Sequence, residues 1–133
     1  MATTIRVRDE TSQGEVTNEL TLEMMTATVT AREIIRSRVY QEVADFNRRK
    51  PQVFRGLVQP KGAVPEKKGY RVGGVKAKPV DWEQQFERAV EAFQKNGFLL
   101  LVDNRQATDL DETIELGVDT TVSFVKLVPL VGG

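Results

Sequence analysis

The chain has 133 residues, of which 40% are hydrophobic and 29% are charged, as expected for one globular domain and too few residues for two. It contains no cysteine and no histidine, which excludes disulfides, thiolate nucleophiles, imidazole bases and metal sites built from sulfur or nitrogen ligands. No apolar run is long enough to cross a bilayer and no secretory signal is visible, so we expect a cytoplasmic protein without a membrane partner.

Alternating polar and apolar residues predict strands over residues 4–8 and 16–24, which a polar turn containing Gly14 separates. Leu20, Leu22 and Met24 then share one face of the second strand. Two strands joined by such a turn indicate a hairpin.

A helix is predicted over residues 31–48. Residues 30–33, Thr-Ala-Arg-Glu, form a capping box, and Pro51 limits continuation of the helix. Its apolar residues recur at helical spacing on one stripe, which is expected to pack on a sheet. The stripe consists of Ala31, Ile35, Val39, Val43 and Phe46. We expect it to contact Ile5, Val7, Leu22, Leu100 and Phe124.

Residues 51–80 are rich in proline and glycine, which predicts an irregular insertion with short strands near residues 53–58 and 70–72. Residues 48–78 hold ten basic side chains and one acidic side chain, Glu66. Such a segment is typical of a solvated loop, but it also fits an acidic partner or nucleic acid.

A second helix is predicted over residues 81–96, capped by Asp81 and ended by Asn96 and Gly97. Its apolar stripe consists of Trp82, Phe86, Val90 and Phe93. An aromatic stripe at this spacing is typical of core packing, so we assign it no ligand.

The last third of the chain is predicted to consist mainly of strands. Residues 98–102 form a continuous apolar run, Ile114 and Leu116 lie in a short acidic strand, and residues 121–131 form the last strand before Gly132 and Gly133. Together these elements predict an α+β fold in which a mixed sheet of four or five strands carries a packed helix.

Three stretches resemble known proteins. Residues 20–24 and 28–35 are similar to the second strand of ubiquitin and the helix that follows it. Residues 122–133, with an apolar strand, a proline and a final Gly-Gly, resemble the prokaryotic sulfur carriers of molybdopterin and thiamine synthesis. Residues 101–106 resemble the turn of those carriers before their last hairpin. The insertion, residues 51–95, has no counterpart in either relative.

The resemblance implies a single ubiquitin-like domain of the β-grasp kind over residues 1–133. Its working group would be the carboxylate of Gly133, with Gly132 and Gly133 forming a thread thin enough for a narrow tunnel. The chain would have no catalytic residue and no metal or bound cofactor of its own. The apolar residues before the glycines would dock on a partner, or else Leu127 and Val128 would complete the core and leave only Leu130 and Val131 free. They are Leu127, Val128, Pro129, Leu130 and Val131, and the free tail is expected from about residue 129.

We expect a modifier whose carboxylate is adenylated by an ATP-using activating enzyme, passed as a thioester to a conjugating enzyme and joined to an amine of a target protein. A deconjugating protease would reverse the reaction. The alternative within the same resemblance is a sulfur carrier with a C-terminal thiocarboxylate, serving cofactor biosynthesis or tRNA thiolation. A third alternative, from another class, is a nucleic-acid-binding module that uses the basic residues 48–78.

Overall fold

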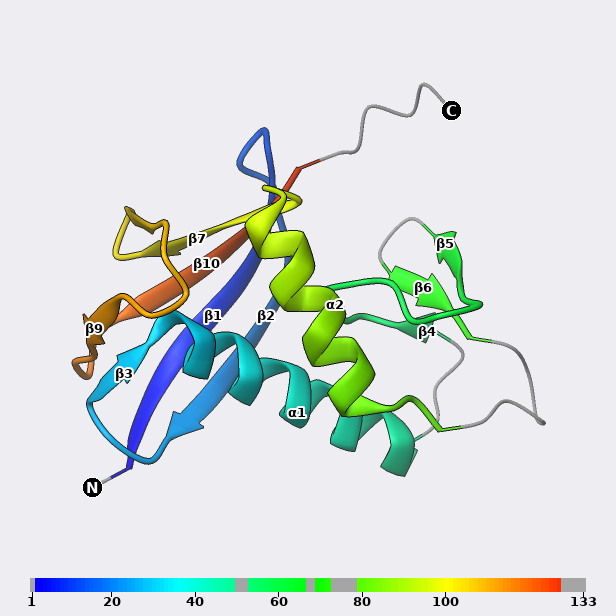
Figure 1. Ribbon diagram of the computed structural model, residues 1–133, viewed down its shortest axis with the longest axis horizontal. Helices are drawn as coiled ribbons and strands as arrows, with labels where there is room; N and C mark the ends of the chain where they lie inside the picture. The colour runs from blue at the N-terminus through cyan, green and yellow to red at the C-terminus, as the bar shows by residue number, and fades with distance from the viewer. Residues whose placement is uncertain (1, 50–52, 67–68, 73–78, 128–133) are drawn as a thin grey trace.

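The computed structural model describes residues 2–49, 53–66, 69–72 and 79–127 (Figure 1). These segments form two helices and three separate sheets. In chain order the elements are β1 (Thr3–Thr11), β2 (Val16–Met24), β3 (Thr28–Thr30), α1 (Ala31–Arg49), β4 (Val53–Phe54), β5 (Val64–Glu66), β6 (Gly69–Arg71), α2 (Trp82–Gln94), β7 (Phe98–Val102), β8 (Arg105–Ala107), β9 (Thr113–Glu115) and β10 (Thr121–Lys126). The predicted α+β class is confirmed.

The main sheet has five strands in the order β2-β1-β10-β7-β8. The last strand of the described chain therefore lies at the centre, where it pairs parallel to β1 and antiparallel to β7. The turn between β7 and β8 places Asp103 and Asn104 at φ values of 48° and 70°, a left-handed conformation that Asn and Asp tolerate better than most residues. The predicted mixed sheet of four or five strands is thus present, and it has five strands.

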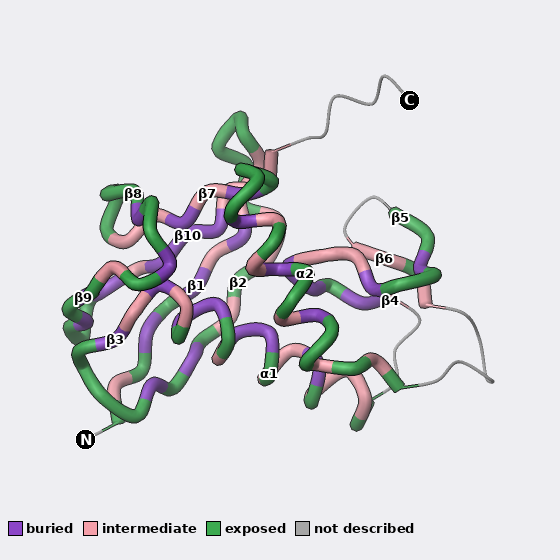
Figure 2. The backbone as a smooth tube through the Cα atoms, viewed as in Figure 1, coloured by how far each residue is buried: buried purple, intermediate pink, exposed green. Residues whose placement is uncertain are grey.

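Helix α1 crosses one face of the main sheet, and the core lies between them (Figure 2). Its capping box is formed as predicted: the Glu33 amide donates to Thr30 Oγ1 and the Thr30 amide donates to Glu33 Oε2, both at 3.2 Å. The predicted stripe residues Ile35, Val39 and Val43 are at most 2% exposed. They share one core cluster with Ile5, Val7, Leu22, Leu100 and Phe124. The predicted burial of the stripe in one core with these strand residues is confirmed for Ile35, Val39 and Val43, whereas Phe46 is only half-buried against that core.

Helix α2 packs against α1 and also contacts β7 (Figure 1). Asp81 caps it by accepting hydrogen bonds from the amides of Glu83 and Gln84. The predicted stripe is only partly correct, because the buried positions are Gln85, Ala89 and Phe93. Trp82, Phe86 and Val90 are half-buried.

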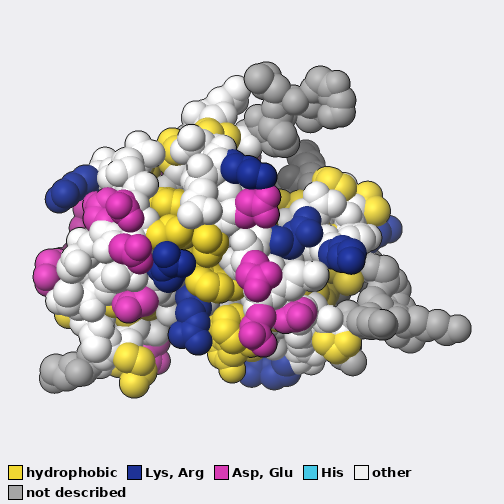
Figure 3. Space-filling view, in the orientation of Figure 1, with side chains coloured by type: hydrophobic (Ala, Val, Ile, Leu, Met, Phe, Trp, Pro, Cys, Tyr) yellow, Lys and Arg dark blue, Asp and Glu magenta, His cyan; other side chains and the backbone are white. Residues whose placement is uncertain are grey.

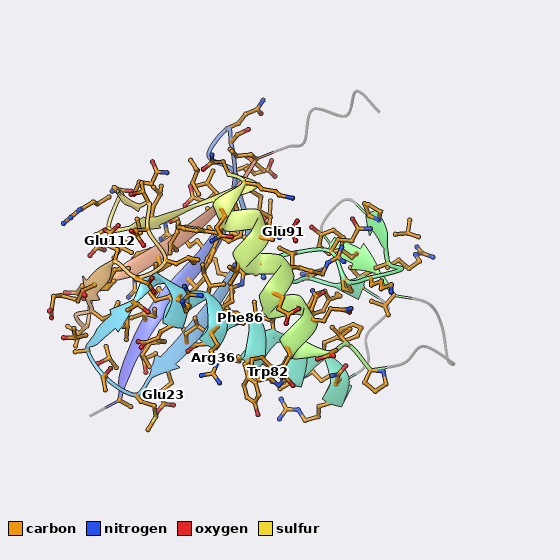
Figure 4. All side chains as sticks on the ribbon, in the orientation of Figure 1. Glu23, Arg36, Trp82, Phe86, Glu91 and Glu112 are labelled. Carbon is orange, nitrogen blue, oxygen red and sulfur yellow. The ribbon has the colours of Figure 1, made fainter. Side chains whose placement is uncertain are left out.

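The buried positions differ from the predicted stripe because α2 packs against both the insertion and α1. Gln85 turns toward the insertion, where its side-chain amide donates to Val58 O at 3.0 Å. Trp82 turns toward α1, where its ring meets Tyr40 edge-on at 5.2 Å and lies under the Arg36 guanidinium at 5.4 Å. Figure 4 shows Arg36, Trp82 and Phe86 close together where α2 lies against α1.

The insertion is more regular than predicted. It contains a three-stranded antiparallel sheet in the order β4-β6-β5, called here the small sheet. The expected strand over residues 53–58 is only Val53–Phe54, the strand near 70–72 is Gly69–Arg71, and Val64–Glu66 was not expected. Strands of two or three residues are shorter than the window in which alternation can be read. Pro65 lies on the edge strand β5, where its missing amide costs no ladder hydrogen bond.

The short acidic strand predicted around Ile114 is β9, which pairs with β3 in a two-stranded sheet. The predicted last strand, residues 121–131, is described as far as Lys126 in β10, and its remainder from Val128 lies outside the described residues. Neither described helix is both long and apolar enough to span a membrane.

Candidate functional site

The structure places only the beginning of the predicted working tail. Leu127 is described, whereas the other predicted residues, Val128, Pro129, Leu130, Val131, Gly132 and Gly133, lie outside the described residues. Leu127 is half-buried, and its amide donates to Gly97 O at 3.2 Å, in the turn after α2. Lys126 and Leu127 are called here the tail root, and they define the site that the structure can address.

The tail root is anchored by the strand before it. Val122 and Phe124 are 0% exposed, and β10 is hydrogen-bonded to β1 on one side and β7 on the other. Moving the tail root would therefore break two ladders and expose core residues. The position of the tail root is therefore fixed by the fold.

A buried group of charges lies beneath the tail root, and is called here the ion cluster: Asp9, Arg38, Glu42 and Lys126. The Arg38 side chain is 0% exposed and that of Asp9 is 1% exposed. Arg38 Nη1 and Nη2 donate to the two carboxylate oxygens of Asp9, the second at 2.6 Å. Arg38 Nε donates to Glu42 at 3.1 Å. The guanidinium is thus shared between two carboxylates, with the Phe124 ring 4.6 Å away.

Lys126 joins the ion cluster to the insertion. Its ammonium group donates to Gly56 O at 2.7 Å, lies 3.9 Å from Asp9 Oδ2 and 6.0 Å from the centre of the Tyr70 ring. Burial lowers the pKa of Lys126, although the Asp9 carboxylate acts in the opposite direction. The last residue of β10 is therefore tied to a segment far away in the sequence.

Glu42 makes a second connection to the insertion, because its Oε1 accepts a hydrogen bond of 3.0 Å from the Leu57 amide. The pKa of Glu42 is raised: burial, helped by the nearby Asp9 carboxylate, outweighs the lowering effects of Arg38 and the Leu57 amide. The pKa of Arg38 is raised: burial opposes this, but Glu42 and Asp9 together outweigh it. Arg38 thus stays cationic, and Glu42 protonates at a higher pH than an ordinary glutamate.

Gly56 is required by the close packing at this junction. A Cβ on Gly56 would lie 2.0 Å from the nearest atom of the Phe54 ring. Phe54 is 1% exposed, and its ring meets Phe46 of α1 edge-on at 5.1 Å. The insertion therefore docks through Phe54, while the Gly56 carbonyl reaches Lys126.

Beside the ion cluster, β2, α1 and β4 enclose a groove of about 620 Å³. Its lining is mixed, with apolar residues such as Leu20 and Phe46 and charged residues such as Asp45 and Arg49. Within the described residues no group of three or more acidic side chains is arranged to hold a metal ion. Arg38 and Asp9 are buried and paired, and the partly exposed Lys126 is bound to Gly56 O, so the ion cluster is suited to position the tail root.

The ion cluster was not predicted from the sequence, although the sequence carries a signal for it. Asp9 continues the buried alternation of Ile5 and Val7 along β1, and Arg38 lies on the buried face of α1 beside Val39. A charged residue in a periodic apolar face indicates a buried partner.

Comparisons of the chain with protein-family models, curated proteins and solved structures found no match.

Proposed function

We propose that the protein is a ubiquitin-like modifier of the β-grasp kind, acting in the cytoplasm in the form that ends at Gly133. The observation that carries the proposal is the position of β10, which runs through the centre of the main sheet and leads toward the Gly-Gly sequence. An N-terminal hairpin, a capped helix across one face and a central last strand parallel to β1 are the arrangement that the resemblance implies. This agreement of topology with the sequence motif supports the β-grasp assignment.

The proposed chemistry belongs to the partner enzymes, and this chain supplies the carboxylate. A carboxylate oxygen of Gly133 attacks the α-phosphorus of ATP, pyrophosphate leaves, and an acyl-adenylate forms. A cysteine thiolate of the activating enzyme then attacks the carbonyl carbon and AMP leaves. Transfer to a conjugating enzyme and attack by a target amine yield an amide bond and release the thiol.

The role of the described residues is to present that carboxylate from a fixed point. The anchored strand and the ion cluster limit the motion of the tail root, so binding of the tail does not require ordering of its root. A smaller ordering cost leaves more of the interaction energy for binding. Two glycines without Cβ atoms then allow the carboxylate to enter a narrow site.

A sulfur carrier is the second candidate, and the apolar sequence around the tail root favours it. Leu127 is followed by Val128, Pro129, Leu130 and Val131, which matches the carriers better than the basic tail of ubiquitin. The two functions share adenylation and differ in the next step, because the carrier's adenylate is converted to a thiocarboxylate.

The test uses protein with an N-terminal tag that ends at Gly133, incubated in a lysate of its source cells with and without ATP. A modifier gives ATP-dependent tagged adducts, of which the thioesters are cleaved by thiol and the amides are not. Mass spectrometry should locate Gly133 on a lysine side chain. A terminal thiocarboxylate without adducts supports the carrier, and a tag that remains unchanged with ATP contradicts both.

A further inference from the structure

Strand β2 forms one edge of the main sheet (Figure 1). It pairs with β1 on one side, and within the described part of the chain no strand pairs with it on the other. The opposite edge, β8, has three residues, whereas β2 has nine. A long edge strand presents a row of backbone donors and acceptors that a further strand can use.

One contact identifies the backbone groups that point outward from β2. The carbonyl of Thr21 accepts a hydrogen bond of 3.0 Å from Gln41 Nε2 of α1, so it points away from β1. The amide of Arg6, which pairs with Thr21, donates in the other direction, to the carbonyl just before β10. In an antiparallel pair the residues that point toward the partner strand alternate with those that point away. The amides and carbonyls of Glu19, Thr21 and Glu23 therefore form the outward edge.

Two of these three positions carry acidic side chains on the sheet face turned away from α1. Glu19 and Glu23 pair with Arg8 and Thr4, which alternate with the buried residues of β1. Both glutamates are exposed, and the contact of Glu19 with Arg8 is long, at 4.0 Å, so it contributes little. Opposite charges at opposed positions of neighbouring strands stabilise the pair, and like charges destabilise it. The β2 edge therefore favours a strand with basic residues opposite the two glutamates.

The other face of the β2 edge opens into the groove that β2, α1 and β4 enclose. Leu20 pairs with the core residue Val7, so its half-buried side chain lies on this side. Phe46 lines the same groove and is also half-buried. Because successive side chains of a strand point to opposite faces, a strand added along β2 would direct every second side chain toward the groove.

The charges of the groove favour an aliphatic side chain there. Glu42 and Asp45 already pair with arginines of α1, at 3.1 and 2.9 Å. Arg49 and Arg55 come from the end of α1 and from the residue after β4, the walls across the groove from β2. A basic side chain in the groove would meet these two arginines. Basic residues of an added strand therefore fit on one face, and aliphatic residues fit on the other.

We propose that the β2 edge is a docking site for an extended segment of a partner protein in which basic and aliphatic residues alternate. The segment adds to the main sheet as a sixth strand, antiparallel to β2. Its backbone pairs with residues 19–23, its basic side chains lie opposite Glu19 and Glu23, and an aliphatic side chain contacts Leu20 and Phe46. Main-chain hydrogen bonds supply the affinity, and the alternation supplies the specificity. This inference goes beyond the proposed function and does not depend on it, because strand addition needs neither ATP nor Gly133.

The probe is a short synthetic peptide of alternating lysine and valine with blocked ends, titrated into the full-length protein by calorimetry and by NMR. One control peptide has the same composition with the lysines and valines grouped, and another has glutamate in place of lysine. Two further peptides carry N-methyl groups, one on the lysine amides and one on the valine amides. In the antiparallel pairing only the lysine amides point toward β2, so the two methylated peptides form a matched pair.

Two protein variants test the contacts on β2. Thr21→Pro removes the outward amide but no hydrogen bond of the β1–β2 ladder, a position where a sheet edge tolerates proline, and Thr21→Val is its control. Glu19→Lys with Glu23→Lys reverses the charge of the edge. Its matched control is Glu83→Lys with Glu87→Lys, the same changes at the same spacing on the exposed side of α2, where Figure 3 shows acidic side chains. Thermal melting establishes that each variant folds, and the charge reversal carries the test if Thr21→Pro does not fold.

The alternating peptide should bind the parent and slow hydrogen exchange at the amides of Glu19, Thr21 and Glu23. The grouped peptide, the glutamate peptide and the peptide methylated on lysine amides should bind about tenfold more weakly or not at all. Methylation on the valine amides should have little effect. Thr21→Pro and the charge-reversed edge should each raise Kd about tenfold, whereas both control variants should stay within about twofold of the parent.

Absence of binding by the alternating peptide, or equal binding of the two methylated peptides, would show that the β2 edge accepts no strand and would overturn the inference. Equal weakening by the charge reversals on β2 and on α2, or stronger binding of the glutamate peptide, would overturn the assigned chemistry. Self-association of the protein without peptide that Thr21→Pro abolishes assigns the edge to a second copy of the chain instead. None of these results bears on adenylation, so failure here is distinguishable from failure of the proposed function.

Discussion

Lys126, the last residue of β10, donates a hydrogen bond of 2.7 Å to the carbonyl of Gly56, which lies 70 residues earlier in the chain. This contact joins the central strand of the main sheet to the small sheet of the insertion. Together with the contact of Glu42 with the Leu57 amide, it makes the tail root and the insertion parts of one packed unit. The stability and activity of the protein should therefore respond together to changes at this junction.

Arg38→Ala should be strongly destabilising, because it leaves the buried carboxylates of Asp9 and Glu42 without their shared cation. Removing one partner of a buried ion pair typically costs about 3–5 kcal/mol. Urea denaturation gives the change in unfolding free energy. The control is Arg48→Ala on the same helix, which removes an exposed pair with Asp45 and should cost less than about 1 kcal/mol. Similar losses for both variants would show that the ion cluster contributes no more than a surface pair.

Glu42 should give the protein a distinctive pH dependence. Its pKa in the folded state is raised by burial above the ordinary value of 4.5, so between these two values the native state binds more protons than the unfolded state. The contribution of Glu42 to stability is therefore fully present below the ordinary pKa and is lost as pH rises through the raised one.

Glu42→Gln cannot titrate, so the unfolding free energy of the parent relative to this variant should fall as pH rises from about 4.5, then level off. Urea denaturation of both proteins at closely spaced pH values measures the difference. A difference that stays constant with pH, or rises over this range, would contradict the assigned pKa direction.

Gly56→Ala should loosen the insertion, because its Cβ would lie 2.0 Å from the Phe54 ring. The ring must move, and overpacking of this kind typically costs about 1–3 kcal/mol. Hydrogen exchange should show faster exchange of the Leu57 amide. The control is Gly117→Ala, whose nearest neighbour to a Cβ is Thr120 Oγ1 at 3.7 Å, an ordinary contact. An unchanged exchange rate at Leu57 in Gly56→Ala would show that the loop tolerates the methyl group.

Local sequence signals account for much of the fold. The hairpin, the capping box at Thr30 and Glu33, the Asp81 cap and the turn at Asp103 and Asn104 each depend on neighbouring residues, and each is present in the structure. The pairing of β1 with β10 depends instead on residues more than a hundred positions apart. No local pattern encodes that pairing, and the sequence predicted a mixed sheet of four or five strands without their order.

The small sheet and the buried ion pair were not predicted from the sequence, for two different physical reasons. The small sheet is built from strands of two or three residues whose stability comes from docking on Phe46 and Lys126, and tertiary contacts of this kind leave no periodic pattern. Asp9 and Arg38 occupy positions whose burial follows from the apolar periodicity around them. The charge of a side chain, however, does not tell which distant residue pairs with it.

Trp82 reports on the docking of α2. It is half-buried, edge-on to Tyr40 and beneath Arg36, so its emission in the native protein should be blue-shifted relative to the unfolded protein. Tyr40→Ala removes this cover and should shift the emission toward that of water-exposed tryptophan, whereas Tyr70→Phe, far from this contact, should not. A water-like maximum in the native parent would show that α2 is undocked.

The final prediction concerns the two glycines. Deletion of Gly133, or Gly132→Phe, should abolish adenylation measured by pyrophosphate exchange, because the first removes the carboxylate in reach and the second places a ring where the thread must be thin. The melting temperature should hardly change, since the buried core of the described residues extends only from Ile5 to Phe124. Gly132→Ala adds a single methyl group and keeps the terminal carboxylate, so it should retain part of the activity. This variant therefore distinguishes a steric effect at position 132 from the loss of the carboxylate. Extension of the chain beyond Gly133 should block exchange until a protease restores that end. Full exchange by the protein lacking Gly133 would remove the terminal carboxylate from the mechanism and leave the basic insertion as the better candidate for the working surface.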